Sequence, residues 1–174
     1  MQPSCKPGSC LGLVFLSLFL TGLGCSKEAI KLSEDSQKIR TILTFVDRLS
    51  QAYQAKDQAG LLALISPDSQ EMLSSLPPLL TRDFQSFDRI ELKSTVDRIE
   101  INKEKVTVVL QWDGQWQNVT TQRLYKEEGI TILRLKESPT LRLVSLEGDL
   151  FFGASTRSSQ IPPTSRNPGS RPNP

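Results

Sequence analysis

The side chains that could perform acid–base chemistry in this chain are carboxylates and tyrosines, because its 174 residues include no histidine. Histidine titrates closest to neutral pH and is a frequent metal ligand. Asp97 and Glu100 lie beside a predicted strand irregularity, where a bulge can redirect a side chain. Tyr53 and Tyr125 could donate hydrogen bonds to an oxyanion. Charged strand residues more often face solvent, and Tyr53 falls on an apolar helix stripe, so we predict no catalytic residue.

Cysteine chemistry is equally restricted, since the chain has only three cysteines. Cys5 and Cys10 precede an apolar run, and Cys25 follows it. A single retained cysteine without histidine excludes a Ser-His-Asp or Cys-His triad and argues against a zinc site. The glycines are scattered singly and form neither a phosphate-binding nor a calcium-binding loop motif. We therefore expect no metal and no cofactor.

Residues 1–24 have the organisation of a signal peptide. Lys6 gives the polar start one positive charge, residues 11–20 form the apolar run, and small residues lead up to Cys25. About ten apolar residues are too few to cross a membrane as a helix, which needs about 20. We predict export, with residues 1–24 removed and residues 25–35 serving as a polar tether.

The residues around the predicted cut resemble the bacterial lipobox, in which a lipid is attached to a cysteine sulfur and the chain is cut before that cysteine. Gly24-Cys25 matches the pattern, whereas the leucine preferred three positions before the cysteine is Gly22 here. The resemblance implies a lipoprotein with a fatty acid such as palmitate on Cys25. It would be anchored in the bacterial cell envelope, at the outer membrane or the periplasmic face of the inner membrane. An ordinary secretory signal or short N-terminal anchor, with Cys25 incidental, is the alternative.

The charge distribution argues against nucleic acid as a partner. The net charge is +2, but four of the 21 basic residues lie in the leader and the C-terminal tail. The domain is therefore slightly acidic, because all 19 acidic residues lie between Glu28 and Asp149. A nucleic-acid-binding domain normally presents a basic patch or stripe, and none is visible in this sequence.

Three helices are predicted in the first half of the domain. Apolar residues recur every three or four positions over residues 36–55, which predicts an amphipathic helix. Asp57 is the expected N-cap of a second, compact helix that carries residues 61–65. Ser66-Pro67-Asp68 favours the start of a third short helix, which Pro77-Pro78 should end.

The second half of the domain changes to the alternating pattern typical of strands. An out-of-phase step near Asp97 predicts a bulge that bends the first strand. Asp113-Gly114 and Glu128-Gly129 are expected to be hairpin turns, and Ser138-Pro139 the last turn. The expected strands cover residues 90–101, 106–112, 116–125, 130–135 and 141–146. This order predicts an α+β fold, with N-terminal helices packed on a curved antiparallel sheet of four to six strands.

Residues 154–174 are rich in Ser, Arg, Asn and Pro, with Ile161 as the one sizeable apolar side chain. Such a composition buries too little apolar area to offset the entropy of ordering. We predict a domain that ends at residue 153 and a disordered tail that is dispensable for folding.

Trp112 and Trp116 flank the predicted hairpin turn at Asp113-Gly114. A large aromatic surface with a polar N–H is a combination enriched at binding surfaces, so these two residues and Tyr125 are the candidate binding residues. They are expected near the open face or mouth of the domain. Cross-strand packing beside the hairpin is the alternative for the two tryptophans.

The order of these elements resembles the nuclear transport factor 2-like superfamily, including its SnoaL-like domains. The resemblance covers residues 36–153 and rests on the three helices, the phrase Leu61-Leu62-Ala63-Leu64-Ile65-Ser66-Pro67, the long bent strand and the closing segment Gly148-Asp149-Leu150-Phe151-Phe152. It implies a cone in which the sheet wraps the first helix. Such a cone can hold a small molecule in its open end or a partner on its sheet face, and homodimers are common in the family.

These features together predict a membrane-tethered module that binds a small molecule or a protein partner. The alternative is an isomerase-, dehydratase- or cyclase-like enzyme that uses Asp or Tyr inside the cone, and a stalk-like structural lipoprotein is a third possibility. The lack of histidine favours binding over catalysis. A deep cavity that holds an acid with a raised pKa would favour an enzyme, and a filled interior would favour a partner-binding scaffold.

Overall fold

The computed structural model describes residues 33–137 and 139–159 of the chain. The predicted signal peptide, Cys25 with most of the tether, Ser138 and the tail from residue 160 lie outside the described residues. Within the described residues, no helix is both long enough and apolar enough to span a membrane.

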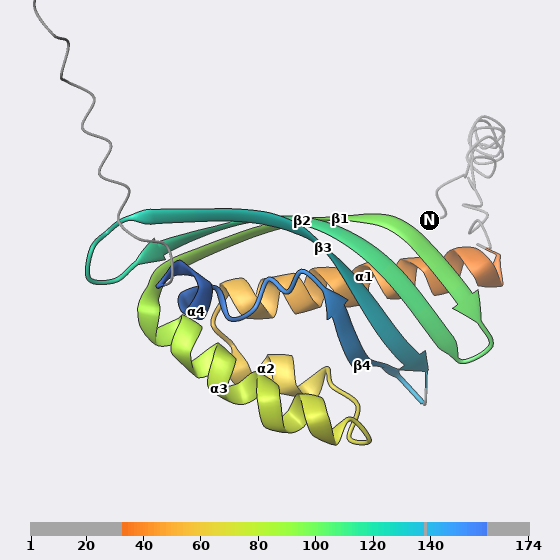
Figure 1. Ribbon diagram of the computed structural model, residues 1–174. Coiled ribbons are helices and arrows are strands. Elements are labelled where there is room, and N and C mark those ends of the chain that lie inside the picture. The colour runs from red at the N-terminus through yellow and green to blue at the C-terminus, as the bar shows by residue number, and fades with distance from the viewer. Residues whose placement is uncertain (1–32, 138, 160–174) are drawn as a thin grey trace, which may run out of the picture. The chain divides into compact units, whose positions relative to one another are not determined.

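Three helices precede a four-stranded antiparallel sheet with strand order β1-β2-β3-β4, and a short helix follows it. The elements are α1 Glu34–Gln54, α2 Gln58–Ala63, α3 Gln70–Ser86, β1 Phe87–Asn102, β2 Lys105–Asn118, β3 Leu124–Glu137, β4 Leu141–Gly148 and α4 Ala154–Ser158. The sheet is bent, and the described helices lie against its concave side (Figure 1). This is the predicted α+β arrangement, in which the helices bury one face of the sheet.

Helix α1 follows the periodicity of its sequence. Ser33 caps its N-terminus by accepting a 3.2 Å hydrogen bond from the Ser36 amide, and two acidic residues complement the helix dipole in the first turn. The buried stripe consists of Ile42, Phe45, Val46, Leu49, Ser50 and Tyr53. A 2.9 Å hydrogen bond between the Ser50 and Ser94 hydroxyls joins α1 to β1. The long helix is thereby held in the bend of the sheet.

Helix α2 begins where the sequence predicts, whereas α3 begins later than predicted. Asp57 caps α2 as predicted, because its carboxylate accepts a 2.8 Å hydrogen bond from the Gly60 amide. Helix α3 begins at Gln70, so the prediction that Ser66 starts it is wrong. The Ser66 amide instead donates a 2.7 Å hydrogen bond to the Leu143 carbonyl of β4, which holds this segment at the edge of the sheet.

Pro77 and Pro78 lie inside α3 and do not end it, contrary to the sequence prediction. Each proline removes one backbone hydrogen bond from the helix. Leu76, Leu80 and Asp83 are nevertheless buried on one stripe that continues past the prolines. Tertiary packing of this stripe outweighs the local loss, and it carries Asp83 into the centre of the domain.

The sheet has fewer and longer strands than expected. The register of β1 against β2 shifts between Val96 and Arg98, which confirms the bulge predicted near Asp97. Both expected hairpin turns are wrong, because Asp113-Gly114 and Glu128-Gly129 lie within continuously paired strands. The predicted strand at 141–146 is confirmed by β4.

The glycines at the two supposed turns make room for tryptophan rings. A Cβ on Gly114 would overlap the Trp116 ring, and a Cβ on Gly129 would lie 2.7 Å from Cζ2 of Trp112. The connection between β2 and β3 spans residues 119–123 instead, and Gln122 adopts a φ of 56° there. A glycine that makes room for a ring has the same local sequence signature as a glycine in a turn.

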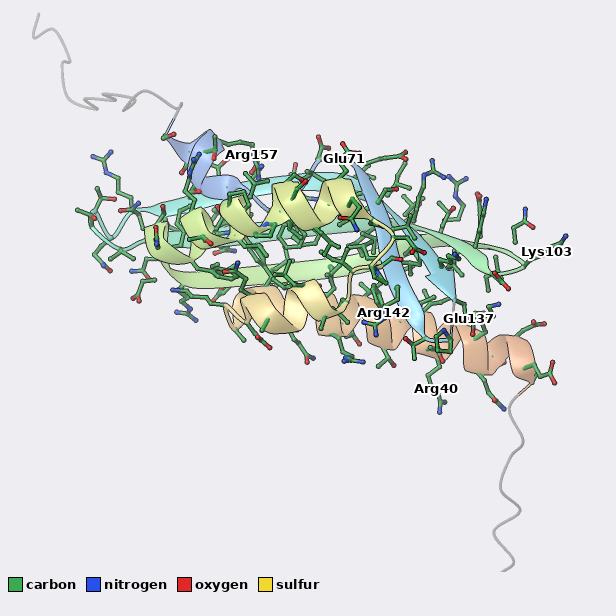
Figure 2. The ribbon with its side chains drawn as sticks, turned by 90° about the horizontal axis from the view of Figure 1, so that it is seen from below. Arg40, Glu71, Lys103, Glu137, Arg142 and Arg157 are labelled. Carbon is green, nitrogen blue, oxygen red and sulfur yellow. The ribbon has the colours of Figure 1, made fainter. Side chains whose placement is uncertain are left out.

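The prediction of a disordered tail is wrong for its first residues. Residues 154–158 form α4, and Ala154 and Ser155 are buried. Helix α4 packs beside α3 near the end of the domain where Arg157 is labelled (Figure 2). The folded domain therefore continues past residue 153.

Candidate functional site

Aromatic side chains fill the concave side of the sheet. Trp112 and Trp116 are 3% and 0% exposed, so their predicted place at an open surface is wrong. Both project from the same face of β2, because residues four apart share a side of a strand. Their rings meet nearly at right angles with centroids 6.2 Å apart. The two tryptophans pack in the core along one strand and do not pair across a hairpin.

Both indole N–H groups are satisfied inside the domain. Trp112 Nε1 donates to the Thr131 hydroxyl at 3.0 Å and to the Asp149 carbonyl at 2.9 Å. Trp116 Nε1 donates to the Tyr53 hydroxyl at 3.1 Å. A buried indole whose N–H is already bonded has no donor left for a ligand.

A buried carboxylate, Asp83, was not singled out by the sequence analysis, although it is 0% exposed. Its Oδ2 accepts hydrogen bonds from the Tyr53 hydroxyl and the Gly153 amide, both at 2.7 Å. Its Oδ1 accepts bonds from the Ser155 amide at 2.9 Å and the Ser155 hydroxyl at 2.6 Å. Four donors compensate the burial of this side chain. The sequence pattern that could have identified it is the buried stripe of α3, because Asp83 follows Leu76 and Leu80 on that stripe.

Tyr53 connects Asp83 to Trp116 at the centre of the domain. Burial, and then the adjacent Asp83, raises the pKa of Tyr53 well above its ordinary value. The hydroxyl therefore stays protonated and donates to Asp83. The Tyr53 ring is 0% exposed and meets the Phe152 ring edge to face at 4.9 Å. Trp116, Tyr53 and Asp83 thus form an enclosed network whose polar atoms bond to one another.

Tyr125 lies at the edge of this interior and is half-buried. Its ring contacts Trp116 with centroids 5.6 Å apart. Burial, and then its hydrogen bond to Glu127, raises the pKa of Tyr125. Arg157 of α4 pairs with Glu127 at 2.7 Å, so α4 covers the domain beside Tyr125.

The carboxylates considered from the sequence are separate from this network. Asp97 and Glu100 are exposed on β1, and Glu100 pairs with Arg98 at 3.3 Å. They lie at the bulge, but the structure does not bring them to Tyr53. Across residues 33–137 and 139–159, no group of three or more Cys, Asp or Glu side chains is arranged to hold a metal ion.

A cleft of about 690 Å³ lies outside the filled interior, between α1 and the start of β4. Arg40 and Arg48 reach it from one side of α1, because residues four or eight apart share a helix face. Arg142 enters from β4, and Figure 2 labels it at the same end of the domain as Glu137 and Arg40, whose side chain extends outward from α1. The apolar side chains in the lining include Phe45, Leu64 and Leu141. The cleft therefore combines cationic and apolar surface.

The charges that line this cleft are unbalanced. Glu137 is its acidic residue, and that carboxylate pairs with Lys38 at 3.0 Å. Arg142 is oriented by a hydrogen bond from its Nη1 to the Ala63 carbonyl, at the C-terminal end of α2. Neither Arg40 nor Arg48 forms an ion pair or a side-chain hydrogen bond with another residue in the part of the chain that the structure describes. Two guanidinium groups are thus free to bind an anion.

No family model matches the sequence, and no curated protein matches it. Solved structures do resemble the domain. A nuclear transport factor 2-like superfamily protein from Salmonella enterica serovar Typhimurium gives a TM-score of 0.56 at 13% identity, over 66% of this chain and 92% of that one. A candidate dehydratase of the same family from Streptomyces avermitilis gives 0.56 at 11% identity, over 64% and 95%. The hexachlorocyclohexane dehydrochlorinase LinA gives 0.52 at 10% identity, over 67% and 87%.

At these identities the likeness concerns the fold. The helices, the bent antiparallel sheet and the solved neighbours together show that the domain has the nuclear transport factor 2-like fold, as the sequence resemblance predicted. Function has to be argued from the side chains that this chain places on the fold.

Proposed function

We propose that this protein is an exported lipoprotein, tethered to a membrane of the bacterial cell envelope by lipid on Cys25, whose domain binds a small molecule or protein partner outside its filled cone. The tether is supported by the apolar run that ends in Gly24-Cys25 and by the absence of any later cysteine from the sequence. The binding role is supported by the state of the cone interior.

The enclosed Trp116–Tyr53–Asp83 network is the observation that carries this proposal. An enzyme such as the dehydratase candidate or dehydrochlorinase among the structural neighbours needs reacting groups that a substrate can touch. Here all three side chains are 0% exposed, and the Asp83 oxygens already accept four hydrogen bonds. Catalysis by these groups would require the core to open, whereas binding at the exterior cleft leaves the core intact.

Self-association is part of the same proposal. The convex side of the sheet carries no helix among the described residues (Figure 1). Val109 lies opposite Ile132 across β2 and β3, and Ile130, which is 50% exposed, lies opposite Gln111. A second copy of the chain would cover this apolar centre. Sedimentation of the detergent-solubilised full chain tests this. We expect the parent chain to be a dimer and Ile130→Glu to be a monomer. A monomeric parent chain, or a dimer that Ile130→Glu leaves unchanged, would contradict self-association.

Labelling of growing cells with a palmitate analogue tests the tether. We expect label on the full chain and on Cys10→Ser, because Cys10 lies before the predicted cut, and no label on Cys25→Ser. Equal label on the full chain and Cys25→Ser would contradict the lipoprotein proposal. Membrane fractionation of the same cells should find Cys25→Ser released from the membrane pellet.

A further inference from the structure

The cleft between α1 and β4 has a distinct chemical character. Three of its lining residues are arginines and one is an acid, which leaves an excess of two positive charges. Because Glu137 is held by Lys38, its charge is already compensated by a residue outside this lining. Guanidinium groups present several N–H donors in one plane and bind carboxylate and phosphate oxygens in pairs.

Two of the arginines belong to α1. Arg40 and Arg48 are two helical turns apart on one face of α1, and neither has a carboxylate partner among the described residues. Arg142 approaches from the opposite wall with its guanidinium already oriented by the Ala63 carbonyl. An anion in the cleft would therefore meet donors from both α1 and β4.

The apolar part of the lining indicates that the ligand has an apolar group in addition to its anionic group. Phe45 and Leu64 belong to the buried core and present only an edge to the cleft, and half-buried Leu141 lies beside them. A volume of about 690 Å³ lies within the range of small-molecule sites, roughly 300–1,000 Å³. A bare inorganic anion would leave most of this space and its apolar surface unused.

We propose that the cleft binds a small anionic amphiphile. Its carboxylate or phosphate head pairs with Arg40, Arg48 and Arg142, and its apolar part packs on Phe45, Leu64 and Leu141. This inference rests on the proposed binding function and specifies the ligand class of the exterior site. Because the core stays closed, binding leaves the emission of the buried tryptophans unchanged.

The test is titration calorimetry with the full chain reconstituted in neutral nanodiscs that are free of detergent. The probes are sodium dodecanoate and dodecyl phosphate below their micelle concentrations. Dodecyltrimethylammonium supplies the same chain with a reversed charge, and inorganic phosphate supplies the anion without a chain. We expect both anionic amphiphiles to bind, and both controls to bind at least tenfold more weakly.

A matched pair of double variants locates the site. Arg40→Gln/Arg48→Gln should weaken dodecanoate binding on the order of 10- to 100-fold, because it removes two charge-assisted contacts. Arg89→Gln/Arg98→Gln removes the same charge from exposed positions on β1 and should bind like the parent chain. Equal affinities in the two variants would overturn the inference.

The other outcomes are equally decisive. Tight binding of dodecyltrimethylammonium, or of inorganic phosphate alone, would overturn the amphiphile class. Binding of the chain to anionic vesicles without binding of free dodecanoate would show a membrane-surface contact and would also overturn it. None of these results bears on palmitate labelling of Cys25, so failure of the ligand class and failure of the tether are distinguishable.

Discussion

The Tyr53 hydroxyl donates a 2.7 Å hydrogen bond to Asp83, and the same carboxylate accepts bonds from Gly153 and Ser155 at the start of α4. Helix α4 has no side-chain cap of its own. Asp83 supplies the acceptors that a capping residue would supply, so one carboxylate joins α1, α3 and the C-terminal helix.

Replacing Asp83 should therefore be costly for stability. Asp83→Ala leaves the buried donors of Tyr53, Gly153 and Ser155 without an acceptor, and we expect a loss of about 3–5 kcal/mol in the free energy of unfolding. Urea denaturation followed by circular dichroism measures it. Asp97→Asn, an exposed carboxylate on β1, is the control and should change stability by less than about 0.5 kcal/mol. Similar stability of both variants would contradict the role assigned to Asp83.

The end of the folded domain can be located by two truncations. Ending the chain at Gly153 removes the Ser155 bonds to Asp83 and the Arg157–Glu127 ion pair, so we expect a loss of about 2–4 kcal/mol. Ending it at Ser159 keeps both and removes residues whose composition offers little apolar area, so stability should stay within about 0.5 kcal/mol. Thermal melts of the two chains compare them directly. Equal melting temperatures would show that α4 adds nothing to the fold.

The sequence predicted those features that a local pattern specifies. The apolar stripe of α1, the N-cap at Asp57 and the bulge near Asp97 each follow from neighbouring residues. The order of helices and strands was sufficient to predict the curved sheet with helices on one side. Local periodicity and fold class are linked because only a few arrangements bury one face of each element.

The sequence misled where distant packing outweighs local preference. Positions 114 and 129 require glycine because indole rings pass over them. This requirement cannot be recognised from the sequence, because it arises only when β1, β2 and β3 are assembled. Pro77 is tolerated because the stripe of α3 is buried on both sides of it. The exterior cleft was missed for the same reason, since its arginines come from α1 and β4, which are about 100 residues apart in the chain.

The core position of the tryptophans reverses the sequence expectation and is directly testable. Trp112→Ala and Trp116→Ala should each cost about 3–5 kcal/mol, the usual cost of removing a large buried aromatic side chain. Trp116→Phe keeps most of the packing and removes the N–H that Tyr53 accepts, so about 1–2 kcal/mol is expected. Iodide should quench the native fluorescence weakly and the urea-unfolded fluorescence strongly. Efficient quenching of the native protein would restore the surface interpretation.

Alkaline pH should destabilise the domain through Tyr53. Burial, and then Asp83, raises the pKa of Tyr53 in the native state, whereas in the unfolded chain the group titrates near its ordinary value of about 10. Below that pH the hydroxyl is protonated in both states, and its contribution to stability is fully present. As the pH rises further, only the unfolded chain releases the proton. Each pH unit then lowers the free energy of unfolding by about 1.4 kcal/mol, until the native pKa is reached.

The measurement is urea denaturation between pH 8 and pH 11 for the parent chain and for Tyr53→Phe. The variant loses the bond to Asp83 and should be less stable at pH 8. Above pH 10 its free energy of unfolding should fall less steeply with pH, and the difference in slope should correspond to the release of about one proton per molecule. Tyr125, whose pKa is also raised, is present in both proteins and contributes equally to both slopes. Identical slopes above pH 10 would mean that Tyr53 ionises in the native state as readily as in the unfolded chain, which would contradict its enclosure beside Asp83.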